Sequence, residues 1–358
     1  METQGLLFIP DISGFTRFVT ETELEHSRHI IEELLGAVID ANEIGLEVSE
    51  IEGDAVLFFR FGHTPELSEL YRQVERMFYA FHERLGAYEI GRFCQCRACI
   101  SASNLTLKIV SHYGEFTSYS VKSFQKLLGR DVIVAHQLLK NDVEQHEYWL
   151  VSAGLLQGAR AADLPPWMEW RRGVKHTESG DVAFEYAPLG KLRETVPPSS
   201  LPNLDLPRKA RMFSASREYA AHIIPLAHAV GDFTYRSRWQ EGVQRVEEVS
   251  HYLPRIGMRC RRVTDRGAVT FYASSYAFRP DRIEIGETDE DKTTTVHFTL
   301  ESLDTYRTRL TVDYYVRKGL LTELWFSLTK RRALEASLER SLLTLDRVVK
   351  ELDVATEY

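Results

Sequence analysis

The chain has 358 residues, 44% of them hydrophobic and 27% charged, and 44 Lys and Arg against 52 Asp and Glu give a formal net charge of −8. This composition is typical of a globular protein, and the length predicts two domains, because one core rarely grows beyond roughly 300 residues. The acidic balance, without a long basic block, argues against nucleic acid or an anionic membrane as the main partner. The sequence has no apolar run long enough for a membrane span and no signal-peptide pattern, so we expect a cytoplasmic protein.

Strands and helices alternate in the first half of the chain. Apolar runs of strand length occupy 6–12, 47–51, 55–61 and 105–116, and helical periodicity occupies 25–43, 66–86 and 131–142. In the first of these helical stretches, Ile30, Leu34 and Val38 recur on one face. Glu52 and Gly53 mark a hairpin turn between the second and third strands. The order βαββαβ predicts an α/β sandwich of the ferredoxin-like type.

Two of these strands have an aspartate at one end. Asp11 lies at the end of the run LLFIPD, and Asp54 follows Gly53 in EIEGDAVLFF. An aspartate at a strand end is usually a turn former. Two such carboxylates, separated by one helix-sized segment, are equally candidates for a pair of metal ligands. The residues alone leave both interpretations open.

Three of the four cysteines cluster in FCQCRAC, at Cys94, Cys96 and Cys99, while Cys260 stands apart. This distribution does not indicate a secreted disulfide framework. A C-x-C-x2-C cluster could hold zinc, but a structural zinc site needs four ligands, and no fourth is evident nearby in the sequence. We therefore expect reduced cysteines at the edge of a strand, with metal binding as the alternative.

The stretch ETVPPSSLPNLDLPRKA, residues 194–210, is rich in proline and without periodicity, which predicts an extended linker. After it come a strand, a helical region at 218–232, several alternating strand segments and an amphipathic helix pattern over 321–352. This order predicts a curved antiparallel sheet closed over one long helix. We expect domains at 1–193 and 211–358, and an α+β fold class for the whole chain.

The first domain resembles the class III nucleotidyl cyclases (adenylate and guanylate cyclases), and more closely a group of uncharacterised bacterial cyclase-like domains. The resemblance rests on four blocks in order, which are FIPDISGFTRF, EIEGDAVLF, LKIVSHYGEF and LLGRDVIVAHQLL. It implies Mg²⁺ or Mn²⁺ held by Asp11, Asp54 and the backbone carbonyl of Ile12, with the ions bridging the phosphates of ATP or GTP. The nucleotide-binding residues that it implies are Phe15, Thr16, Glu50, Gly53, Lys108 and Arg130.

The sequence departs from this family where catalysis is decided. Ile133 stands at the position of the ribose-orienting Asn, and Gln137 stands at that of the transition-state Arg. An apolar side chain cannot orient a ribose, and a neutral amide cannot neutralise phosphoryl charge as a guanidinium does. Lys126 occupies the second base-selecting position beside Glu50, so the sequence does not specify a purine. Class III cyclases build their sites across a head-to-tail pair, which implies a homodimer here.

The second domain resembles the START-like fold, also called polyketide cyclase-like or SRPBCC. The stretch RWQEGVQRVEEVSHYLPRIGMRCRR is similar to the second and third strands of that fold. The resemblance implies a helix-grip fold with an apolar cavity for a small hydrophobic ligand. Candidate lining residues, each of which is also suited to ordinary core packing, are Trp239, Tyr272, Tyr276, His297, Tyr314 and Trp325.

Three hypotheses follow from these two resemblances. The leading one is a signalling or sensor protein whose degenerate cyclase-like domain binds nucleotide and metal, and whose START-like domain binds a small hydrophobic ligand. The alternative is an active class III nucleotidyl cyclase regulated by the START-like domain. The third is a lipid- or polyketide-handling enzyme in the second domain with the first as a dimerising scaffold, although the second domain has no recognisable nucleophile and base motif.

Overall fold

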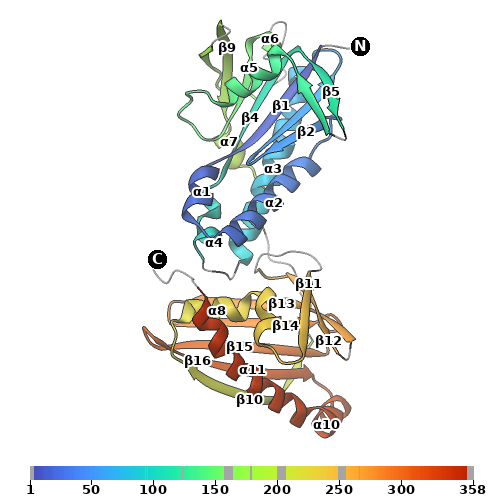
Figure 1. Ribbon diagram of the computed structural model, residues 1–358, viewed down its shortest axis with the longest axis vertical. Coiled ribbons are helices and arrows are strands. Elements are labelled where there is room, and N and C mark those ends of the chain that lie inside the picture. The colour runs from blue at the N-terminus through green and yellow to red at the C-terminus, as the bar shows by residue number, and fades with distance from the viewer. Residues whose placement is uncertain are drawn as a thin grey trace. The chain divides into compact units, whose positions relative to one another are not determined.

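The computed structural model describes residues 4–92, 94, 96–122, 124–156, 164–177, 180–199, 207–248, 255–265 and 267–352. The chain forms two compact units (Figure 1). The first unit comprises Met1–Gly86 and Ser101–Ser199, and the second comprises Ala87–Ile100 and Ser200–Tyr358. The second unit therefore includes a segment from the first half of the sequence, in addition to everything after the proline-rich stretch.

The first unit is built on a seven-stranded sheet in the order β2-β3-β1-β4-β7-β9-β8. Its strands are β1 (Gln4–Ser13), β2 (Glu47–Glu52), β3 (Ala55–Phe61), β4 (Thr106–Glu115), β7 (Tyr148–Ser152), β8 (Arg171–Thr177) and β9 (Gly180–Pro188), and β5 (Thr117–Val121) pairs separately with β6 (Phe124–Leu128). Its helices are α1 (Phe15–Glu21), α2 (Leu24–Asp40), α5 (Arg130–Leu139), α6 (Ala153–Leu156), α7 (Gly190–Arg193) and the 3-10 turn η1 (Ala102–Asn104), while α3 (Leu67–Gly91) and α4 (Arg97–Ser101) extend into the second unit's segment. The strands and helices expected in this half are present, and the sheet continues beyond them through β7, β9 and β8.

The strand β1 is buried on both faces of the sheet. Leu7 and Ile9 join the core cluster to which Val134 and Leu138 of α5 contribute. Leu6 and Phe8 point to the opposite face, since side chains alternate along a strand, and are fully buried as well. The near-continuous apolar run of the sequence is thus explained by helices on both faces of the sheet.

The second unit is a seven-stranded antiparallel sheet in the order β10-β16-β15-β14-β13-β12-β11. Its strands are β10 (Lys209–Tyr219), β11 (Val243–Glu248), β12 (Arg259–Thr264), β13 (Gly267–Arg279), β14 (Arg282–Asp289), β15 (Thr294–Asp304) and β16 (Arg307–Arg317). Its helices are α8 (Ile223–Gly231), the 3-10 turn η3 (Phe233–Tyr235), α9 (Arg236–Trp239), α10 (Leu320–Thr329) and α11 (Arg331–Glu351). The helix α11 lies across the sheet (Figure 1), and the hydroxyl of Tyr219 on β10 donates to the carbonyl of Leu342 at 2.8 Å.

The long terminal helix expected over 321–352 is in fact two helices. The chain turns at Lys330, whose φ of −116° departs from helical values, and α11 begins at the next residue. The helix α10 contributes Phe326 to a small core cluster. Its other apolar side chains are exposed, so within this terminal segment α11 supplies the side chains that join the main core of the sheet.

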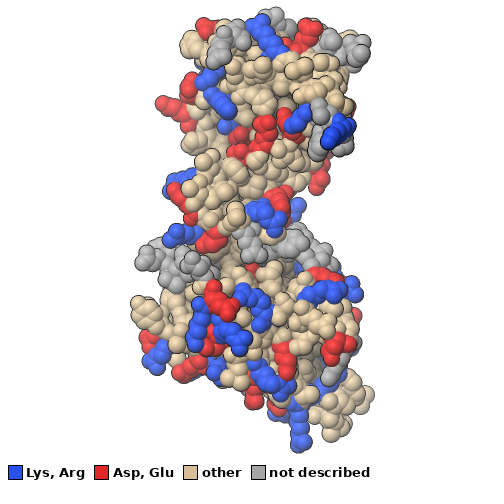
Figure 2. Space-filling view, viewed as in Figure 1, with Lys and Arg blue, Asp and Glu red and all other residues tan. Residues whose placement is uncertain are grey.

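Surface charge is mixed on the visible face of the described residues. Figure 2 shows basic and acidic side chains interspersed there, without a broad basic patch. Among the described residues, no helix combines the length and the hydrophobicity needed to cross a bilayer.

Candidate functional site

The register of β1 between its two neighbours brings the candidate metal ligands together. Asp11 lies opposite Ala55 of β3 on one side and opposite Lys108 of β4 on the other. The backbone N–H of Ile12 donates to the carbonyl of Asp54 at 3.0 Å. Asp54 immediately precedes β3, so antiparallel pairing places the two aspartates, 43 residues apart in the sequence, beside each other.

The hairpin turn that carries Asp54 depends on Gly53. This glycine has a φ of +63°, in the left-handed region that other residues rarely adopt. A Cβ added at Gly53 would lie 3.6 Å from the ring of Phe15, at the start of α1. The turn after β2 and the turn after β1 therefore pack against each other. This contact fixes both aspartates at the same end of the paired strands β1 and β3.

Burial and mutual repulsion make the carboxylate pair reluctant to ionise. Burial raises the pKa of Asp11, and Lys108, whose Nζ lies 3.2 Å from Asp11 Oδ1, partly offsets this rise. Burial, followed by the charge of Asp11, raises the pKa of Asp54 to about 6. A divalent cation between the two carboxylates would relieve both effects, and carboxylate oxygens are donors that suit Mg²⁺ or Mn²⁺. The donor set therefore fits the metal site implied by the sequence.

The candidate nucleotide-binding residues differ in burial. Phe15 is half-buried, and Thr16 is exposed on α1. Arg130 is exposed at the first position of α5. Glu50 on β2 forms an ion pair with Lys126 of β6, so the structure joins the two side chains that the resemblance implies for base selection. Together with Gly53 and Lys108 described above, these are all the residues that the sequence suggested for the nucleotide.

Ile133 and Gln137, at which the sequence is expected to depart from the cyclases, both lie on α5. Ile133 is 57% exposed, and Gln137 follows one helical turn later on the same face. Neither side chain supplies a cation. The helix therefore presents an apolar group and an amide at these two positions.

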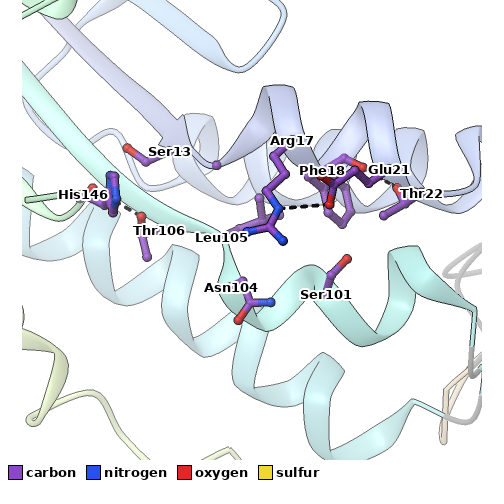
Figure 3. A pocket seen from close by; sticks show the side chains of 11 residues that line it. Ser13, Arg17, Phe18, Glu21, Thr22, Ser101, Asn104, Leu105, Thr106 and His146 are labelled. Atoms are coloured by element: carbon purple, nitrogen blue, oxygen red, sulfur yellow. Dashed lines mark hydrogen bonds and ion pairs between the residues drawn. The ribbon is translucent and has the colours of Figure 1, made fainter. Parts of the chain in front are cut away.

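The sequence did not reveal a hollow at the end of β1. It has a volume of about 540 Å³ and begins at Ser13, two residues beyond Asp11 (Figure 3). Arg17 projects into it from α1 and donates through Nε to Glu21 at 3.0 Å, and Thr106 donates to the carbonyl of His146 at 3.3 Å. The spacing of Arg17 and Glu21, four apart on a helix, is the signal from which the ion pair could have been expected.

A second hollow, of about 510 Å³, lies on the α1 and α2 side of the hairpin. Its lining is mostly apolar and includes Phe15, Leu24, Ile31, Leu35, Ile51 and Gly53. Two of these side chains are strongly exposed, Leu24 at 71% and Ile51 at 52%. An apolar surface of this kind, next to the carboxylate pair, is typical of an area that another protein surface covers.

The second unit contains a cavity of about 130 Å³ between its sheet and α11. Trp239 and Tyr314, two of the expected residues, line it together with two buried arginines, Arg236 and Arg262. Both guanidiniums pair with one carboxylate, that of Glu287. Neither Nε–H has a hydrogen-bond partner among the described residues.

The other four residues expected to line this cavity lie elsewhere in the described part of the unit. Val296 and Phe298 line the cavity, so strand alternation turns His297 to the opposite face of the sheet. Trp325 is 53% exposed on α10, with Lys330 Nζ 4.7 Å from its ring centroid. Tyr272 and Tyr276 are buried and partly buried on β13 without reaching the cavity.

The clustered cysteines were expected at the edge of a strand, and this expectation is wrong. Cys94 and Cys96 are in the irregular stretch after α3, and Cys99 is in the short helix α4. All three are buried, and none forms a disulfide. The hydrophobic residues around the cysteines are consistent with their burial. The expectation of a strand overlooked the short helix that begins at Arg97.

Comparison with known proteins identifies partial relatives. A family described as a protein of unknown function, DUF2652, matches residues 31–148. An uncharacterized protein of Mycobacterium tuberculosis (strain ATCC 25618 / H37Rv) is 35% identical over 116 residues, which are 32% of this chain and 54% of that protein. The chain thus spans about half the length of this curated relative.

Solved structures similar to this chain include nucleotidyl cyclase domains. The guanylate cyclase domain of RhGC from Catenaria anguillulae, in complex with GTP, is 13% identical with a TM-score of 0.38, over 52% of this chain and 96% of that one. The adenylyl cyclase CyaB from P. aeruginosa is 14% identical with a TM-score of 0.35, over 52% of this chain and 93% of that one. Identities and TM-scores this low do not assign a function to the chain.

The first prediction concerns how much the carboxylate pair destabilises the folded protein. Because the folded-state pKa of Asp54 is raised to about 6, the folded protein holds this proton more tightly, and its stability falls as pH rises through the window from about 4 to about 6. Asp54→Asn should therefore stabilise the protein at pH 7.5 without added divalent cations. The shift of about two pH units corresponds to at most roughly 3 kcal/mol, which solvent screening of this half-exposed group reduces to about 1 kcal/mol.

The same variant should lose the response to a cation. Added Mn²⁺ should raise the melting temperature of the wild type, less so below pH 6, where Asp54 is protonated, and should have little effect on Asp54→Asn. Asp40→Asn, which alters an exposed carboxylate at the end of α2, is the matched control. Equal Mn²⁺ stabilisation of the wild type and Asp54→Asn would show that the pair is not a metal site.

Proposed function

We propose that the first unit is a nucleotidyl cyclase-like module that binds a purine nucleotide, ATP or GTP, together with Mg²⁺ or Mn²⁺. The observation that carries this proposal is the pair of mutually repelling carboxylates, the buried Asp11 and the half-buried Asp54, on adjacent strands. A bound divalent ion would supply the positive charge that the pair needs and would attract phosphate oxygens.

Lys108 gives the site a second means of binding phosphate. Its ammonium is paired with Asp11 at 3.2 Å. A divalent ion on Asp11 would compete for this carboxylate and release Lys108 to interact with an anionic ligand. Cation and nucleotide binding should then reinforce each other, since each removes a charge that would otherwise lack a partner.

We also propose that this module turns nucleotide over slowly or not at all. Ile133 cannot orient a ribose, and Gln137 cannot neutralise charge on a transferring phosphoryl group. The lack of an arginine in such a role costs on the order of 10³-fold or more. The chain would then act as a signalling or sensor protein, and an active cyclase remains the competing hypothesis.

The second unit is proposed to bind a small hydrophobic ligand in the START-like manner. Its sheet, the helix α11 and the cavity between them support this assignment. A cavity of about 130 Å³ is close in size to one that holds benzene, so the isoprenoid and polycyclic ligands that the fold suggests are too large for it. The unpartnered Nε–H groups of Arg236 and Arg262 favour a ligand that also has an acidic group.

A homodimer of the first unit is part of the same proposal. Several apolar side chains of β2 and α5 are exposed, among them Val48 at 43%, Ile51 at 52% and Ile133 at 57%. Burying them against a second copy would remove apolar surface from water and bring one copy's α5 toward the other copy's carboxylates.

The second prediction separates nucleotide binding from cation binding. Lys108→Met should weaken the binding of Mn²⁺–ATP or Mn²⁺–GTP by about tenfold or more, because a charged hydrogen bond to phosphate is lost. It should leave Mn²⁺ binding alone intact or tighter, because Asp11 loses its competing cation. Isothermal titration calorimetry measures both, with Lys140→Met at the exposed end of α5 as the control. Unchanged nucleotide affinity in Lys108→Met would exclude the proposed role.

The third prediction concerns turnover. Purified protein incubated with ATP or GTP and Mn²⁺ should form at most traces of cyclic nucleotide, measured by mass spectrometry. The double variant Ile133→Asn, Gln137→Arg restores the two missing functional groups, so we expect its rate to exceed that of the wild type. Rapid cyclisation by the wild type would favour the alternative, an active cyclase.

The fourth prediction concerns the cavity of the second unit. Benzoate, which combines a small ring with a carboxylate, should raise the melting temperature of the full chain in a concentration-dependent way, because a ligand stabilises the state that binds it. Benzyl alcohol, of nearly the same size but uncharged, should raise it less. The absence of any shift with either compound at millimolar concentration would remove the ligand-binding role.

The fifth prediction concerns assembly. Light scattering at tens of micromolar should give the mass of a dimer, and Ile133→Glu should shift the population toward monomer by placing a charge on the apolar surface. Leu328→Glu, which alters a leucine on α10 of the second unit that is 78% exposed, serves as the control. A strictly monomeric wild type would exclude the dimer.

A further inference from the structure

Three buried thiols of the second unit converge on one point. Cys94, Cys96 and Cys99 are 2%, 1% and 1% exposed, and their Sγ atoms all lie within 4.8 Å of one another. Two ligand sulfurs of a tetrahedral zinc site, each about 2.3 Å from the metal, are separated by roughly 3.8 Å. The thiols are therefore spaced closely enough for a shared ion with little rearrangement.

Backbone N–H groups are already directed at two of these sulfurs. The N–H of Cys96 donates to Cys94 Sγ at 3.5 Å, and the N–H of Cys99 donates to Cys96 Sγ at 3.5 Å. A neutral thiol is a weak acceptor, whereas a thiolate accepts such bonds strongly. The local backbone thus suits sulfur atoms that have lost their protons to a metal.

A nitrogen donor from a distant part of the sequence contacts the cluster within the same unit. His228, on α8, places Nδ1 3.3 Å from Cys94 Sγ. Its ring nitrogens do not lie within 4.8 Å of all three sulfurs, so His228 borders the cluster at Cys94, where a ring N–H can donate to a metal-bound thiolate. A carboxylate oxygen of Asp232 lies within 4.8 Å of a ring nitrogen of His228.

We propose that Cys94, Cys96 and Cys99 bind one zinc ion as thiolates, with one further donor completing the tetrahedron. Three buried thiolates are typical of a structural zinc site rather than a catalytic one. The ion would hold the segment Ala87–Ile100 together beside α8, which belongs to the same unit. This inference is independent of the proposed nucleotide site, whose ligands are oxygens.

The direct test is the metal content of the full chain. The wild type, expressed with added zinc and desalted without chelator, should contain about one zinc per chain by plasma mass spectrometry. Cys96→Ser should retain less than about a tenth of that amount, because a tetrahedral site loses one of three thiolates. Cys260→Ser, which alters the other buried cysteine of this unit, should keep the full amount.

Cobalt substitution tests the ligand set without relying on a variant that folds. The Co²⁺ form of the wild type should show thiolate-to-cobalt charge-transfer absorption and the intense d–d bands of a tetrahedral site. Cys96→Ser should lose most of this absorption, whereas Cys260→Ser should keep it. A wild type with no zinc and no such absorption would overturn the site.

Discussion

The antiparallel register of β1 against β3 and β4 is the constraint on which the first unit's site depends. Leu7 and Ile9 face the core under α5, and the intervening residues face the opposite core, so a shift of one residue would expose both sets. The same register places Asp11 opposite Ala55 and Lys108. Hydrophobic burial along the strand thus fixes a pair of carboxylates that would repel each other if they were free to move.

Both units contain buried charge, but they compensate it differently. In the first, Asp11 has Lys108 as its partner while Asp54 keeps a raised pKa, so the negative charge of the pair is only partly compensated. In the second, Glu287 is shared by Arg236 and Arg262, and the two guanidiniums also stack over aromatic rings, at 4.8 Å over Trp239 and 4.2 Å over Phe271. Removing Glu287 would leave two buried cations, which is far more costly than removing an exposed ion pair. The first arrangement is suited to binding a cation, and the second to binding an anion.

Local patterns predicted the elements of the fold, while the contacts that complete the sites are long-range. The strand of Asp11, the hairpin of Asp54 and the helix of Ile133 were readable because periodicity and turn residues act over a few positions. The pairing of Lys126 with Glu50 spans 76 residues and that of His228 with Cys94 spans 134, and neither leaves a mark in the adjacent sequence. The break at Lys330 was missed for the opposite reason, since the amphipathic pattern continues across it without a proline or glycine.

The two proposed metal sites differ in the hardness of their ligands, and this difference makes them separable. Asp11 and Asp54 offer carboxylate oxygens, which suit Mg²⁺ and Mn²⁺, whereas Cys94, Cys96 and Cys99 offer thiolates, which select zinc. A strong chelator would strip both, and a loss of stability could then be assigned to neither. Titrating Mg²⁺ into zinc-loaded protein leaves the sulfur site saturated, because magnesium competes poorly for thiolates. Any Mg²⁺-dependent change that survives Cys96→Ser but disappears in Asp54→Asn therefore belongs to the carboxylate pair.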